Sequence, residues 1–67
     1  MLPEILKVII KRVREEHFKD EPYRVEYQMI KQEDGIIKYK EIVAYENKDE
    51  NVLISVIVNR KGEHTVE

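Results

Sequence analysis

Two alternating runs separated by a glycine-containing turn constrain this chain most. From Tyr23 to Gln32, and again from Ile36 to Tyr45, apolar and polar side chains alternate with the two-residue period of a half-buried strand. The residues between the runs, Glu33-Asp34-Gly35, suit the tight turn of a β-hairpin. The sequence therefore predicts an antiparallel hairpin around which the rest of the chain is arranged.

The turn allows two registers, and side-chain pairing favours one of them. A two-residue loop, Asp34-Gly35, would set Met29 against Lys40, whereas a three-residue loop that includes Glu33 pairs mainly apolar and aromatic residues. We predict the three-residue loop, because a one-residue slip turns a whole strand face the wrong way. Its pairs on one face are Met29–Tyr39, Tyr27–Glu41, Val25–Val43 and Tyr23–Tyr45.

The only helical pattern lies at the beginning of the chain. Pro3 suits the first helical position, and Pro22 disfavours helical geometry at Glu21, so we predict a one-sided amphipathic helix over about residues 3–19. Its charged residues, Arg14 among them, fall on the solvated side. The apolar stripe comprises Leu2, Ile5, Leu6, Ile9, Ile10 and Val13.

Beyond Tyr45 the pattern predicts two more strands. A polar run, residues 46–51, forms a turn that sets Tyr39 opposite Val58 on the third strand, and Arg60-Lys61-Gly62 forms a second three-residue turn. The predicted fold is α+β: one N-terminal amphipathic helix packed on one face of a four-stranded antiparallel β-meander. A single domain spans residues 1–67, with strands at about 23–32, 36–46, 52–59 and 63–66.

Size and composition limit what such a chain can be. A domain of 67 residues without cysteine has a marginal core and no disulfide, so a partner subunit or very regular packing must add stability. A net charge of −2 gives no general attraction for nucleic acid or an anionic membrane. With no membrane-spanning stretch or signal peptide, we expect a soluble protein, cytoplasmic if natural.

The sheet face opposite the helix carries more apolar residues than a solvated face needs. We interpret this face as a partner interface, most simply that of a homodimer. Scattered surface aliphatic residues are the alternative. The residues concerned are Ile30, Ile42, Ala44, Leu53 and Ile57.

Glu41 violates the pattern, because it places an acid in the middle of the predicted core face. One interpretation is a polar anchor inside a small-molecule pocket; the other is a β-bulge near Lys40-Glu41 that turns the acid to solvent. An unpaired acid there would be replaceable by leucine without loss of stability. The pocket residues would be Tyr23, Tyr27, Tyr39, Glu41 and Tyr45.

Neither a catalytic group nor a metal site emerges from the sequence. His17 has acidic neighbours but no second ligand one helical turn away, His64 and Glu41 are predicted two strands apart, and Ser55 lies on the other face from His64. We therefore expect no enzyme activity, no cofactor and no metal. Weak nucleic-acid binding through Lys38, Lys40, Arg60 and Lys61 is a further alternative, although a row of stacking aromatics is missing.

The expected function is a structural or protein-interaction module that self-associates. Regular alternation, matching turns and a sequence with 39% charged residues are also typical of thermostable proteins and of idealised designs. A designed scaffold without a natural function is therefore an alternative origin.

Overall fold

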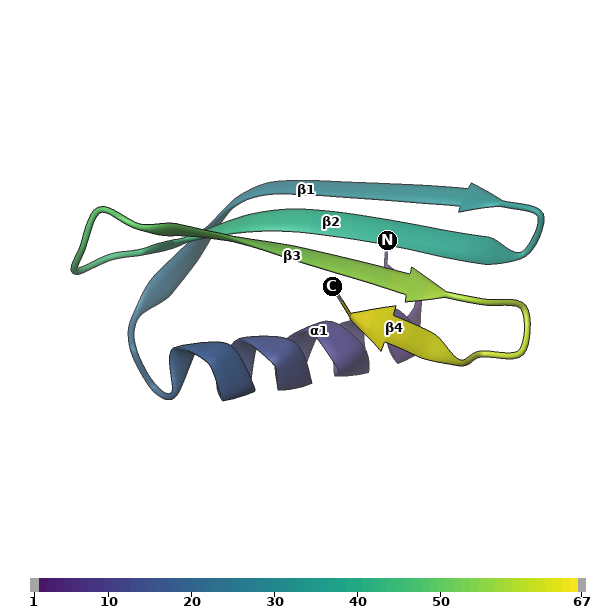
Figure 1. Cartoon of the computed structure of the whole chain (residues 1–67), viewed down its shortest axis with the longest axis horizontal. Helices are drawn as coiled ribbons and strands as arrows, with labels where there is room; N and C mark the ends of the chain where they lie inside the picture. The colour runs from purple at the N-terminus through teal and green to yellow at the C-terminus, as the bar shows by residue number, and fades with distance from the viewer. Residues whose placement is uncertain (1, 67) are drawn as a thin grey trace.

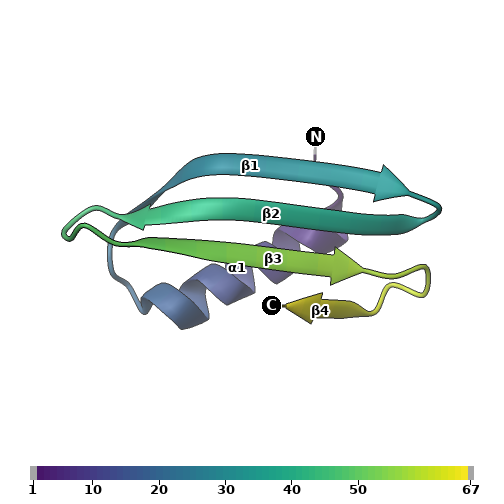
Figure 2. The ribbon, with the colours of Figure 1, turned by 45° about the horizontal axis from the view of Figure 1, so that its top comes forward.

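The structure, a computed structural model, describes residues 2–66 and has the predicted α+β architecture (Figure 1). All four strands pair antiparallel in the order β1-β2-β3-β4, and the helix crosses one face of this sheet (Figures 1 and 2). The elements are α1 (Glu4–Phe18), β1 (Tyr23–Glu33), β2 (Ile36–Tyr45), β3 (Asn51–Val58) and β4 (His64–Val66).

Helix α1 buries Leu6, Ile9 and Ile10 of its apolar stripe against β2 and β3, whereas Ile5 of the same stripe is 45% exposed. Pro3 is the residue before the helix and not, as predicted, its first residue. At the other end, Lys19 has the left-handed conformation and donates its N–H to Glu15 O at 3.1 Å. No helix within residues 2–66 is long and apolar enough to cross a membrane. The core comprises Leu6, Ile9, Ile10, Phe18, Tyr39, Val43, Ile54, Val56 and Val58.

The β1–β2 hairpin corrects the predicted register. Its loop has two residues, Asp34 and Gly35, with φ of 53° and 77°, and Glu33 pairs with Ile36. Two consecutive positive φ angles match the right-handed twist of the flanking strands, which favours this turn over the three-residue loop. The predicted pairing of Tyr27 with Glu41 is therefore wrong.

A β-bulge reconciles this loop with the predicted pairs at the other end of the hairpin. The pairs Tyr23–Tyr45 and Val25–Val43 are as predicted, and the register then shifts between Val25 and Tyr27, so that Glu26 is the extra residue. From there to the turn, each residue of β1 lies on the face opposite to the predicted one.

We call the sheet face turned away from α1 the open face; its apolar members are Tyr27, Met29, Ile36, Ile42, Ala44, Leu53 and Ile57. The bulge moves Tyr27 and Met29 onto this face. It also places Ile30, a predicted interface residue, beside Tyr39 on the face that α1 covers.

The remaining pairings are close to those predicted. Between β2 and β3 the structure pairs Tyr39 with Val56 instead of Val58, a slip of two residues. An even slip leaves every side chain on its face, so alternation could not distinguish the two alignments. The predicted pair Val58–His64 between β3 and β4 is confirmed, and Gly62 has the expected positive φ of 84°.

Replacing Gly35 with alanine should lower the free energy of unfolding by about 1 kcal/mol or more, because its φ of 77° strains an L-residue. A Cβ at this position would also lie 3.1 Å from Arg60 Cγ. Urea unfolding measures the change, and Asp34→Asn is the control, since asparagine tolerates the left-handed conformation. Equal stability of the Gly35→Ala variant and the wild type would contradict the observed turn.

Candidate functional site

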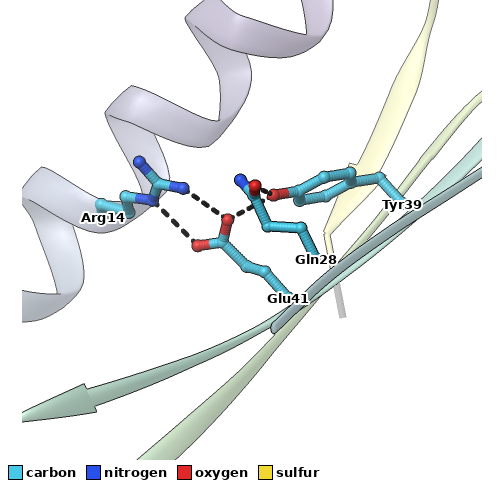
Figure 3. Close-up of polar contacts among 4 residues, drawn as sticks. All are labelled: Arg14, Gln28, Tyr39 and Glu41. Atoms are coloured by element: carbon cyan, nitrogen blue, oxygen red, sulfur yellow. Dashed lines mark hydrogen bonds and ion pairs between the residues drawn. The ribbon is translucent and has the colours of Figure 1, made fainter. Parts of the chain in front are cut away.

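The most unusual group of side chains surrounds Glu41, whose side chain is fully buried between the sheet and α1 (Figure 3). Arg14 on α1 donates from Nε to Glu41 Oε2 at 2.9 Å and from Nη2 to Glu41 Oε1 at 2.6 Å. Tyr39 donates its hydroxyl hydrogen to Glu41 Oε1 at 2.5 Å and accepts a hydrogen bond from Gln28 Nε2 at 2.9 Å. These four residues connect α1, β1 and β2.

The network compensates the carboxylate for the water it has lost. A buried charge is costly unless it is paired and hydrogen-bonded, and the planar guanidinium offers two parallel donors to the two carboxylate oxygens. The hydrogen bond to Glu41 raises the pKa of Arg14 above its ordinary value. Burial, together with the hydrogen bond to Glu41, raises the pKa of Tyr39 to about 12.

Glu41 is therefore a paired acid, and the prediction of a bulge that exposes it is wrong. A bulge does exist, but on the neighbouring strand at Glu26. Sequence reasoning assigned Arg14 to the solvated helix side, whereas its side chain is only 20% exposed. The available signal was that a buried acid requires a base on the covering helix, and Arg14 follows the buried Ile10 by one turn.

The five predicted pocket residues are not brought together around one cavity. Tyr39 and Glu41 belong to the network, and Tyr27 lies on the open face. Tyr23 and Tyr45 pack on Phe18 with ring centroids 4.7 Å apart in each case, which closes the end of the core where α1 ends.

The open face carries one continuous apolar row. Tyr27 lies directly opposite Ile42, and Ile42 directly opposite Leu53, so the row crosses three strands. Tyr27 is 51% exposed and Leu53 is 61% exposed. Ala44 is buried, and Ile57 is half-buried further along the face.

A groove of about 380 Å³ lies between α1 and β4 and has a mainly apolar lining. Val8 and Val66 contribute to its walls, with Arg12, Glu16 and His64 as polar members. Ser55 is opposite Lys40 on the open face, on the other side of the sheet from this groove. A serine–histidine pair is therefore not formed by the one serine of the chain.

Within residues 2–66, no three His, Cys, Asp or Glu side chains gather closely enough to hold a metal ion. His17 instead packs its ring edge-on against Phe18, with the centroids 5.1 Å apart.

The basic residues predicted as a nucleic-acid contact lie towards the hairpin end of the sheet. Lys38 and Lys40 are exposed on the open face, and Lys61 is exposed on the turn before β4. Arg60, on the same turn, donates from Nε to Asp34 O at 2.5 Å and so holds the first hairpin turn.

Comparison of the chain with protein-family models, curated proteins and solved structures found no match.

Replacing Glu41 with leucine should lower the free energy of unfolding by about 2 to 4 kcal/mol, because the partly buried Arg14 would lose its counter-charge. The double variant Arg14→Leu with Glu41→Leu should recover at least about half of that loss, since removing both members of a buried pair is often nearly neutral. A double-mutant cycle by chemical denaturation measures the coupling. Additive effects of the two single changes would contradict a coupled pair.

Stability should also fall in alkaline solution as Tyr39 ionises. Its pKa is raised to about 12 from an unfolded value of about 10, so its contribution is complete below about pH 10 and is lost as the pH rises through about 12. Unfolding measured across this range should show a shallower decline in a Tyr39→Phe variant. The same slope in both proteins would exclude Tyr39 as a source of the decline.

Proposed function

We propose that this chain is a non-enzymatic self-association module that contacts a second copy through the open face of its sheet. The observation that carries the proposal is the row Tyr27–Ile42–Leu53 at the centre of that face, in which Tyr27 and Leu53 are exposed and Ile42 is half-buried. Helix α1 covers the other face and leaves the open face free for a partner.

A second copy fits this face because the row is compatible with two-fold symmetry. An axis running along the row sets each of its three side chains on its own counterpart. The same operation brings Lys40 over Ala44, two residues away on the other side of Ile42. Ala44 is already buried within its own chain, so the methylene stem of the lysine lies over the neighbouring side chains and its ammonium group can reach solvent.

The size of the face indicates a contact that depends on concentration. Three long strands about 4.8 Å apart, each contributing about eight residues at about 3.3 Å, give a flat face of roughly 400 Å². Stable complexes bury about 800 Å² per partner. We therefore expect association at high micromolar concentration and dissociation on dilution.

Leu53→Lys should weaken this association at least about tenfold, because two lysines would meet across the two-fold axis. Sedimentation equilibrium over a dilution series measures the change. Val8→Lys is a matched control, since Val8 on α1 lies away from the open face and is 58% exposed, while Leu53 is 61% exposed. Unchanged association of Leu53→Lys, or equal weakening by Val8→Lys, would refute a contact through the open face.

A further inference from the structure

We infer that the outer edge of β1 is a second self-association surface, which pairs antiparallel with the same edge of another copy and sets Met29 opposite its own counterpart. This edge contact is separate from the proposed contact through the open face. It rests on the order of charges along β1 and on the position of the bulge.

β1 is the first strand in the sheet order, so only one of its edges is paired. It is the longest strand, with 11 residues from Tyr23 to Glu33, and all of them are exposed. Alternate residues of an antiparallel strand turn their N–H and C=O groups outward. The pair Glu33–Ile36 beside the turn is hydrogen-bonded, so Glu33 turns its backbone groups towards β2. Gln32 and every second residue before it therefore turn their backbone groups outward, among them Ile30 and Gln28.

The charges on this edge are self-complementary. In chain order Arg24, Glu26, Lys31 and Glu33 carry positive, negative, positive and negative charge. Each basic residue already forms an ion pair with the acid two positions later, with N–O distances of 3.1 Å for Arg24–Glu26 and 3.7 Å for Lys31–Glu33. Read backwards, the order has the opposite sign at every position, so two antiparallel copies place unlike charges against each other.

The bulge makes the spacing fit. Glu33 lies four residues after Met29, and Arg24 lies five residues before it. The bulge at Glu26 removes one step from the ladder, so both charged residues are four pairing steps from Met29. With Met29 opposite itself, Lys31 therefore faces the bulge at Glu26 and Tyr27, and Glu33 faces Arg24. The outward residues Gln28 and Ile30 then face each other, as a bonded pair requires.

Charged residues and bulges on edge strands usually prevent pairing, because like charges meet or the strand bends away. On β1, charge repulsion would disfavour only those alignments of two copies that place like charges opposite each other. In the Met29-centred register they supply four unlike contacts by symmetry, so they select one partner alignment, that of a second copy. Opposite charges directly across a strand pair are stabilising and like charges are destabilising.

Two charge reversals test this contact in the Leu53→Lys background, in which the open face is blocked. In a Lys31→Glu dimer, the acid at position 31 of each copy faces Glu26 of the other copy. In a Glu26→Lys dimer, the lysine at position 26 of each copy faces Lys31 of the other copy. Each variant alone should therefore pair at least about tenfold more weakly. A 1:1 mixture restores both unlike contacts and should give a mixed dimer about as strong as the parent. Native mass spectrometry with one variant labelled with nitrogen-15 identifies the mixed species.

Lys11→Glu provides the control, because it makes the same charge change at an exposed position on α1. It should leave pairing unchanged, and circular dichroism should show that all variants are folded. Because the edge contact is separate from the open-face contact, the Leu53→Lys parent should still form dimers where wild type forms larger species. The inference is overturned if this parent is monomeric at concentrations at which wild type associates, or if the mixture forms no mixed dimer. Either result leaves the open-face contact standing, since that contact is judged by comparing wild type with Leu53→Lys.

Discussion

The buried carboxylate of Glu41 imposes a geometric requirement on the packing of α1. An apolar stripe can slide or rotate on an apolar sheet at modest cost, since the hydrophobic effect has no direction. A fully buried acid cannot be left without donors, so the helix must present Arg14 at the one height and rotation from which its two N–H groups reach both oxygens. The ion pair thus specifies one arrangement among several that would bury similar apolar area.

The same requirement extends into the sheet through Tyr39. Its hydroxyl group donates to Glu41 and accepts from Gln28, and this continues the chain of bonds to the edge strand β1. Gln28 can reach Tyr39 because the bulge at Glu26 turns it towards the helix. Helix position, the core of the sheet and the register of its edge strand are therefore linked by one set of polar contacts.

Local patterns predicted the elements and their order, while the long-range pairing was only partly predictable. The period of the helix and the alternation of the strands depend on near neighbours, and Gly62 marked the last turn correctly. The bulge depends on a competition between the turn geometry of Asp34-Gly35 and side-chain pairing further along the strands, which alternation does not reveal. Arg14 and Glu41 are 27 positions apart, so neither one indicates the other locally.

The bulge also means that the β1–β2 hairpin contains one surplus residue, which has two places to reside. In the structure the surplus is Glu26; in the other arrangement Glu33 would join the loop and the bulge would vanish. Both arrangements keep Tyr23 opposite Tyr45, so they differ only in which sheet face each side chain from Tyr27 to Gln32 occupies. The hydrogen bond that the Gln28 side-chain amide donates to the Tyr39 hydroxyl group belongs to the observed arrangement alone. This hydrogen bond in the core therefore favours the register in which the surplus residue is Glu26.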